Sequence, residues 1–148
     1  MTISIRPLHE EHAEAWRALW QAYLAFYQTE LSADVSDHTW RQIVRNENIK
    51  GLAAFDNQGR MLGFAHIVLH PNTWNTTDCC YLEDLFVDSR YRWLGVARSL
   101  IEAVYRLAEQ HNCNRVYWVT AQDNHAAQAL YHQVARQTGM VQYRKDFQ

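Results

Sequence analysis

The 148-residue chain has little proline, glycine or cysteine: two Pro, five Gly and three Cys. The sequence contains no internal repeat or low-complexity tract, and no linker rich in Pro, Gly or Ser divides it. We therefore expect one domain over residues 1–148. Two of the three cysteines, Cys79 and Cys80, are adjacent, which does not suit a disulfide framework and favours a reducing, cytoplasmic location.

Long apolar runs and an excess of basic charge are also missing. No run approaches the roughly 20 residues that cross a bilayer, and the N-terminal "MTISIRPLHEEH" lacks the hydrophobic core of a signal peptide. The formal net charge is −2, which gives no support to nucleic-acid binding. The eight histidines have no matching set of cysteines or carboxylates, so we expect no metal site. Membranes, nucleic acids and metals are thus not expected partners.

Aromatic residues are plentiful, with six Trp and eight Tyr, and they recur with apolar residues at regular spacings. The spacings predict, in order, a strand at 2–6, helices at 10–28 and 39–45, a hairpin at 50–70 turning at 56–59, a strand at 79–87, a helix at 95–110, a strand at 115–121, a helix from 124 and a last strand at 140–147. The strand–helix–strand unit within 81–120 predicts a parallel crossover. The fold class is therefore α/β (α+β), a mixed sheet flanked by helices.

The stretch "SRYRWLGVARSL", residues 89–100, leads from a predicted strand into a helix. The backbone N–H groups at a helix start are unpaired and carry partial positive charge, which suits a phosphate. Gly95 and Ala97 leave the main chain accessible there, and Arg90 and Arg92 add positive charge. A glycine that only relieves a tight turn at the helix start explains the same pattern, so spacing alone does not decide.

Two motifs together resemble the GCN5-related N-acetyltransferase (GNAT) superfamily. They are Arg-x-x-Gly-x-Ala at 92–97, placed after "LEDLFV", and "DNHAAQALYHQVA" at 123–135. "YLEDLFV" is similar to spermidine/spermine acetyltransferases, whereas "RVYWVTAQDNHAAQALYHQVA" and "QYRK" are similar to the fungal histone/polyamine acetyltransferase group. The resemblance covers essentially the whole chain. It implies a centrally splayed sheet, acetyl-CoA as cosubstrate and a homodimer.

The resemblance also implies where acetyl-CoA binds. The loop Arg92, Trp93, Leu94, Gly95, Val96 and Ala97 would hold the pyrophosphate, while Leu85, Phe86, Val87 and Asn124 would contact the pantetheine arm. The position of Trp93 is commonly glycine in the family. A bulky ring there restricts the backbone, and we expect this protein to differ most from its relatives at that point.

Amine acetylation needs a base for the ammonium and a proton for the departing thiolate. Glu83 and Asp84 are the candidate bases, and strand alternation would place Glu83 with Tyr81 and Leu85 on one face and Asp84 with Leu82 and Phe86 on the other. Alternation does not choose between them; the resemblance favours Glu83 as base and implies Tyr131 as general acid. The alternatives are carboxylates that pair with Arg or cap loops, and a tyrosine of the core.

The expected acceptor is a primary amine of a small cation, polyamine-like or lysine-like. By position in the family, the acceptor pocket would be bordered by Tyr23, Tyr27, Glu30 and Asp84. An amino acid, a histone or other protein lysine, and a non-catalytic acetyl-CoA-binding regulatory module remain as alternatives. The strand-like "MVQYRKDF" at the C-terminus is expected to pair with a partner chain's sheet edge if the protein is a homodimer.

Overall fold

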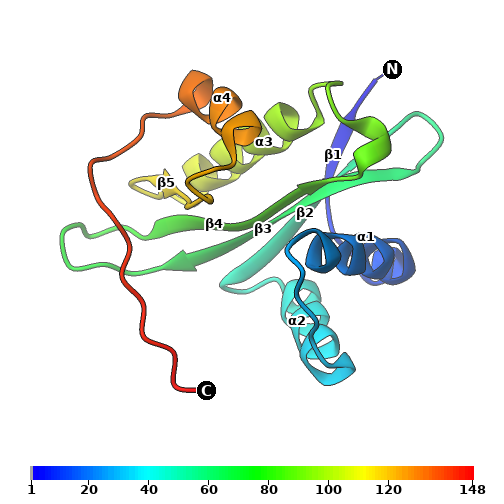
Figure 1. Cartoon of the computed structure of the whole chain (residues 1–148), viewed down its shortest axis with the longest axis horizontal. Helices are drawn as coiled ribbons and strands as arrows, with labels where there is room; N and C mark the ends of the chain where they lie inside the picture. Colours follow the sequence, from blue (N-terminus) through cyan, green and yellow to red (C-terminus); the bar gives the residue numbers. More distant parts are fainter. Residues whose placement is uncertain (1) are drawn as a thin grey trace.

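The computed structural model describes residues 2–148, which form one five-stranded mixed sheet in the order β1-β2-β3-β4-β5, with helices on both faces (Figure 1). The strands are β1 (Ser4–Pro7), β2 (Ile49–Phe55), β3 (Met61–His70), β4 (Cys79–Val87) and β5 (Val116–Tyr117). The α-helices are α1 (Ala13–Phe26), α2 (Ala33–Arg45), α3 (Val96–Gln110) and α4 (His125–Val134), and the 3-10 turns are η1 (Glu10–His12) and η2 (Ser89–Tyr91). This confirms the predicted fold class. No helix among residues 2–148 is long and apolar enough to span a bilayer.

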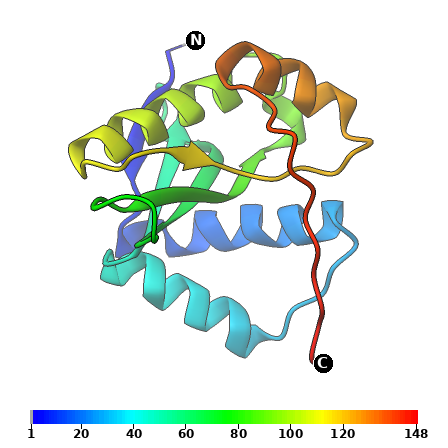
Figure 2. The ribbon, with the colours of Figure 1, turned by 90° about the vertical axis from the view of Figure 1, so that its left-hand side faces the viewer.

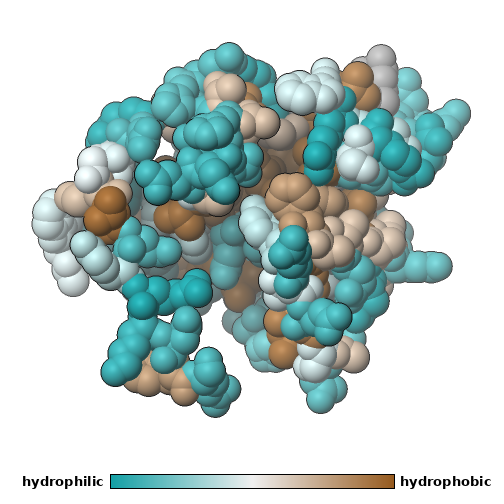
Figure 3. All heavy atoms as spheres, in the orientation of Figure 1, coloured by the Kyte–Doolittle hydropathy of each residue, from teal (hydrophilic) through white to brown (hydrophobic). Residues whose placement is uncertain are grey.

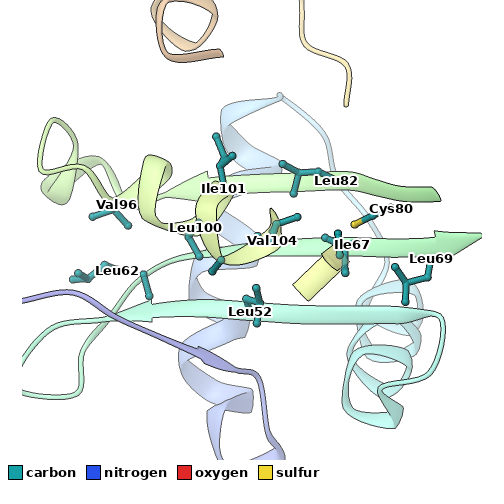
Figure 4. Packing of buried hydrophobic residues seen from close by; sticks show 14 residues of the cluster. Leu52, Leu62, Ile67, Leu69, Cys80, Leu82, Val96, Leu100, Ile101 and Val104 are labelled. Atoms are coloured by element: carbon teal, nitrogen blue, oxygen red, sulfur yellow. The ribbon is translucent and has the colours of Figure 1, made fainter. Parts of the chain in front are cut away.

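The sheet separates two hydrophobic cores. Figure 2 shows α1 and α2 below the sheet and α3 and α4 above it. On the α3 face, Leu100, Ile101 and Val104 are completely buried against β2, β3 and β4 (Figure 4). On the α1 face, Trp16 and Phe64 are completely buried in a core of large rings. Burying both apolar faces stabilises a central sheet whose β3 is inaccessible along most of its length.

The second helix is longer than its apolar pattern predicts. It starts at 33 rather than 39, because the Ser32 hydroxyl accepts a hydrogen bond from the backbone N–H of Val35 and caps the first turn. It ends where Asn46 adopts a left-handed conformation, with φ 57°. Residues 33–38 carry little apolar signal, so the cap sets this boundary.

A β-bulge interrupts the pairing of β3 with β4. His66 lies opposite Asp84, whereas the next residue, Ile67, lies opposite Leu82, so Glu83 is the extra residue. The predicted alternation is therefore wrong beyond this point. Leu82 packs in the α3 core and Phe86 in the α1 core, although strict alternation assigns them to one face.

The strand β5 is shorter than the predicted 115–121. It pairs with β4 in parallel at two positions, Cys80 with Val116 and Tyr81 with Tyr117, which confirms the predicted parallel crossover. Beyond these pairs the chain of 118–121 leaves the sheet, while β4 continues to Val87. The sheet thus splays between β4 and β5, as the family resemblance implied.

The predicted strand at 140–147 does not form. The chain after α4 has no strand assignment, and Figure 1 shows it running past the ends of β3 and β4 and away from the body. Alternating side chains favour a strand only where a neighbouring edge can accept its backbone hydrogen bonds. The two-residue β5 offers no such continuous edge to its own chain.

Candidate active site

The loop between β4 and α3 leaves a helix N-terminus open. Gly95, the N-cap of α3, has φ 80°, and a Cβ at this position would meet nothing within 4 Å. Within residues 2–148, no side chain caps this end of α3. Its first backbone N–H groups are therefore available to an anion, which the helix dipole also favours.

The rest of the loop is exposed on one side and anchored on the other. Trp93 is in the left-handed region, with φ 69°, and its side chain is 90% exposed. Leu94 is also exposed, Ala97 is half-buried, and Val96 is buried in the α3 core. Val96 thus holds the first turn of the helix against the sheet, while the preceding residues present their backbone to solvent.

The two loop arginines have different partners. The Arg90 guanidinium donates to both carboxylate oxygens of Asp88, at 3.2 and 2.8 Å, so its charge is paired. Arg92 lies 5.6 Å from the centre of the Phe26 ring at the end of α1, and it has no carboxylate partner among residues 2–148. Arg92 is therefore the cation that this loop can offer to a phosphate.

The splay next to this loop exposes one edge of β4. Leu85, Phe86 and Val87 pair with β3 on one side, whereas the β5 side has no strand beyond Tyr81. Their side chains are held by the cores on the two faces, so the main-chain groups on the open side are fixed in position. An extended, amide-containing ligand can bind along this edge as an added strand does.

The bulge brings Glu83 and Asp84 to the same face of β4. Leu82 and Leu85 both pack toward α3, and the Asp84 carboxylate binds the hydroxyl of Tyr23 on α1, at 2.6 Å. Asp84 also contacts Nδ1 of His66, at 2.9 Å. Asp84 therefore pairs with a tyrosine and a histidine. The alternative expected from the sequence, a carboxylate that pairs with an arginine or caps a loop, does not apply to it.

The Glu83 carboxyl has the electrostatics of a base. Its pKa is raised above the ordinary glutamate value, first by burial and then by the negative charge of Asp84. The residue as a whole is nevertheless exposed, so its carboxyl remains within reach of a ligand. Glu83 in turn helps to raise the pKa of Tyr23 and Tyr81, which places its charge beside both rings.

Tyr131 of α4 faces this region from the far side of the splay. Its ring meets Trp118 edge-on, with centroids 5.3 Å apart. Burial, followed by the proximity of Tyr27, raises the pKa of Tyr131, so the hydroxyl keeps its proton at neutral pH. Among residues 2–148 this hydroxyl makes no hydrogen bond, which leaves it free to donate to a ligand.

The other predicted site residues are placed less closely together. Asn124 caps α4, its side-chain oxygen accepting from the N–H of Ala127 at 3.3 Å, so only its amide N–H groups are open to a ligand. Tyr27 is half-exposed at the end of α1. Glu30 lies in the exposed connection to α2 and forms no ion pair within residues 2–148. The structure thus brings Tyr23, Glu83 and Asp84 together, whereas Glu30 forms no hydrogen bond or ion pair with them.

The chain matches the Acetyltransferase (GNAT) family over residues 7–135. The chain belongs to this family. It is 37% identical over 97% of its length to the D-amino-acid N-acetyltransferase HPA3 of Saccharomyces cerevisiae, 91% of which is covered. It is also 31% identical over 50% of its length to the spermine/spermidine N(1)-acetyltransferase of Bacillus subtilis, 51% of which is covered.

Solved structures support the GNAT fold. The aminoglycoside acetyltransferase AAC(6')-Iy, in complex with the bisubstrate analogue CoA-S-monomethyl-acetylneamine, superposes with a TM-score of 0.86 and 23% identity over 99% of both chains. A ribosomal-protein-alanine N-acetyltransferase from Brucella melitensis superposes with a TM-score of 0.84 and 19% identity, over 99% of this chain and 100% of the other. Together with this fold, the family match over residues 7–135 and the similarity to the yeast enzyme show that the protein is an acetyl-CoA-dependent N-acetyltransferase of the GNAT family.

The residues present fit acetyl-CoA. Three features follow one another along the chain: the free edge of β4, the unpaired Arg92 and the uncapped start of α3. Each can bind a different part of the coenzyme. For a metal the fit is poor. Residues 2–148 contain no group of three or more His, Cys, Asp or Glu side chains placed to hold an ion.

Two residues beneath the site were missed from sequence. His66 is 3% exposed on β3 and joins Asp84 to the indole N–H of Trp16, which is completely buried. The signal available was a histidine within the otherwise apolar run "LGFAHIVL". A buried polar side chain there needs hydrogen-bond partners, but the sequence does not identify them.

Proposed function

We propose that this GNAT enzyme acetylates the primary amine of a small cationic acceptor, polyamine-like or lysine-like. The observation that carries the proposal is the pair of carboxylates, Glu83 and Asp84, on one face of β4 at the splay. Two adjacent carboxylates attract an ammonium group, and the neighbouring rings of Tyr23 and Tyr27, 5.1 Å apart, add faces on which a cation can rest. These residues thus form an acidic, aromatic site next to the proposed coenzyme-binding residues.

In the proposed mechanism Glu83 is the base. An alkyl ammonium has a pKa of about 10.4 and no free electron pair, so its proton must leave before the nitrogen can attack. The raised pKa of Glu83 makes its carboxylate a stronger base than an exposed glutamate. Glu83 takes the proton directly or through a water molecule, while Asp84 holds the amine.

Tyr131 is the proposed acid, and the loop and β4 hold the cosubstrate. Acetyl-CoA supplies an activated acetyl thioester; the nitrogen–carbon bond forms as the carbon–sulfur bond breaks. Tyr131 gives its proton to the departing sulfur. Arg92, Gly95 and Ala97 bind the pyrophosphate, with Trp93, Leu94 and Val96 shaping the same loop. Leu85, Phe86, Val87 and Asn124 bind the pantetheine arm and leave the acetyl group beside Glu83.

An amino-acid acceptor is the second candidate, because the yeast D-amino-acid N-acetyltransferase is similar to this chain over nearly its full length. Glu83 and Asp84 favour the cationic acceptor, since like charges would repel the amino acid's carboxylate. Tyr27 and Glu30 belong to the acceptor side in either case. A protein lysine and a coenzyme-binding module without turnover remain as further alternatives.

The test measures thiol release from acetyl-CoA with 1,4-diaminobutane, spermidine, an aminoglycoside, L-lysine, D-amino acids and a histone-tail peptide. We expect the di- and polyamines to give the highest kcat/KM. Glu83→Gln should lower kcat about 10²- to 10⁴-fold, the range of general-base catalysis, while Glu102→Gln on the exposed side of α3 should not. Coenzyme binding without any acetylated amine would show a non-catalytic module instead.

We also propose that residues 1–148 act as one acetyltransferase domain, that the protein is a homodimer and that it is cytoplasmic. The C-terminal segment, residues 140–148, supports the dimer because it exposes Met140, Val141, Tyr143 and Phe147 by 75–91%. Figure 3 shows this segment standing apart from the body, with open space beside it. Three free cysteines, two of them buried, favour a reducing compartment.

A further inference from the structure

A chain of hydrogen bonds runs from the core of the protein to the carboxylate of Asp84. The Trp16 indole N–H donates to Nε2 of His66, at 2.9 Å. Because an indole nitrogen only donates, Nε2 must be the acceptor, and the proton of a neutral His66 ring must sit on Nδ1. That proton then points to Oδ2 of Asp84, 2.9 Å away.

The other carboxylate oxygen is held from the opposite side. The Tyr23 hydroxyl donates to Oδ1 of Asp84, at 2.6 Å, and burial followed by the Asp84 charge raises the pKa of Tyr23. Tyr23 therefore stays a donor. Each oxygen of Asp84 receives one fixed hydrogen bond and keeps a second lone-pair direction for a ligand.

The hydrogen bonds that link Trp16, His66 and Asp84 begin in the core and are not surface contacts. Trp16 is 0% and His66 3% exposed, and the Trp16 ring packs against the rings of Trp20 and Trp40. The His66 ring is stacked on Phe64, with centroids 4.5 Å apart. Neither ring can turn without disturbing the core, so the direction of the Nδ1–H bond is set by packing.

The bulge places this rigid contact next to the proposed base, Glu83. Asp84 lies opposite His66, and Glu83 is the extra residue beside Asp84, so His66 fixes where the Asp84 carboxylate lies relative to the proposed base. An ammonium carries three N–H donors and can be shared by two carboxylates. A loosely held Asp84 would bind the same cation in several geometries, most of which misplace its nitrogen.

We propose that Trp16 and His66 are positioning residues: Trp16 fixes the Nδ1–H tautomer of His66, and His66 fixes Asp84 as the anchor for the acceptor's ammonium. The proposal rests on the proposed function, since it assigns Asp84 to the amine. It adds two buried residues, outside the acceptor and coenzyme contacts, that determine how well a cationic acceptor binds.

Substitutions at His66 separate a positioning role from a structural one. His66→Leu removes the donor at similar volume, whereas His66→Asn keeps an N–H donor close to the place of Nδ1. We expect His66→Leu to raise the KM for 1,4-diaminobutane at least 10-fold and to leave the KM for acetyl-CoA within twofold. His66→Asn should recover most of the loss. Equal losses in both variants would overturn the proposal.

The wild-type enzyme provides a readout that does not depend on whether a variant folds. Ring ¹⁵N chemical shifts should place the His66 proton on Nδ1, and a proton on Nε2 would contradict the hydrogen-bond chain. With coenzyme A bound, 1,4-diaminobutane should shift the Nδ1 resonance, whereas the neutral 1,4-butanediol should not. Trp16→Phe should yield a mixture of tautomers and a several-fold higher KM for the diamine.

The two proposals can fail separately. If no amine in the panel is acetylated, the proposed function fails whatever His66 does. If diamines are acetylated while the His66 resonance does not respond to them and His66→Leu matches His66→Asn, Trp16 and His66 do not position Asp84.

Discussion

At the scale of single residues, the two adjacent carboxylates on β4, Glu83 and Asp84, lead to a prediction about the pH dependence of activity. The pKa of Glu83 is raised by burial and by the charge of Asp84, and Glu83 must be ionised to act as base. Activity should therefore rise with pH along a limb that lies above the ordinary glutamate range. Asp84→Asn removes the second cause, so the acidic limb of kcat/KM should move to lower pH. The measurement is a pH–rate profile for each protein.

The control is Asp34→Asn, an exposed carboxylate in the first turn of α2. It should leave the limb unchanged. A limb that stays in place in Asp84→Asn, or that remains unchanged in Glu83→Gln, would contradict the assignment of Glu83 as base.

Trp93 has a strained backbone. Its φ of 69° lies in the left-handed region, which glycine adopts freely and other residues adopt at a cost in free energy. The ring is 90% exposed and so offers little packing in return. We expect Trp93→Gly to be more stable than Trp93→Ala by about 1 kcal/mol, the usual scale of left-handed strain. Urea unfolding of the two variants isolates the backbone effect, since both lack the ring. Equal stabilities would show that the loop relaxes.

At the scale of secondary-structure elements, the close approach of β3 and β4 predicts a sensitive position. A Cβ on Gly63 would lie 2.5 Å from the carbonyl oxygen of Phe86 and 3.1 Å from Cα of Val87. These are backbone atoms of β4, the strand proposed to bind the coenzyme, and they cannot move aside without loss of strand pairing. Gly63→Ala should lower the free energy of unfolding by about 1–3 kcal/mol, the range of overpacked cores, and raise the KM for acetyl-CoA.

Gly139→Ala is the matched control, because a Cβ there would meet nothing within 4 Å. Its effect on the free energy of unfolding should stay within about 0.5 kcal/mol, as for other surface changes. Thermal and urea unfolding, together with acetyl-CoA titration, compare the two alanines. If Gly63→Ala is as mild as Gly139→Ala, the strands have room to separate.

The elements also show how far sequence predicts this structure. Apolar periodicity predicted α1, α3 and strands β1 to β4, because their faces are set by burial. It missed the first half of α2, which depends on the Ser32 cap. Apolar periodicity also did not predict the bulge at Glu83, because the register of β4 depends on its pairing with β3. Motifs proposed Glu83, Tyr131 and the loop, but the buried contact of His66 with Asp84 joins positions 18 apart and leaves no local pattern.

At the scale of the whole molecule, the candidate site is formed where the two layers meet at the splay. The α1 layer supplies Tyr23 and Phe26, and the α3 layer supplies the loop and, through α4, Tyr131. The layers touch where Arg92 lies over Phe26. On the far layer, α4 is fixed to α3 by the Tyr105 hydroxyl, which donates to the carbonyl of Val134 at 2.8 Å. Both sides of the site are therefore held by the body of the fold, independently of the C-terminal segment.

The C-terminal segment is therefore available to pair with a second copy of the chain. Residues 140–148 expose four apolar side chains by 75–91% and pair with no strand within residues 2–148, whereas β5 is one edge of the sheet. Such a segment is stabilised when it pairs with a second copy. The full chain should therefore have twice its 17.5 kDa mass in solution, and a chain ending at Gly139 should be a monomer that still binds acetyl-CoA. Light scattering after size exclusion measures this, with Lys145→Ala as a control that stays dimeric. A monomeric full chain, or a dimer that survives the truncation, would rule out this role for the segment.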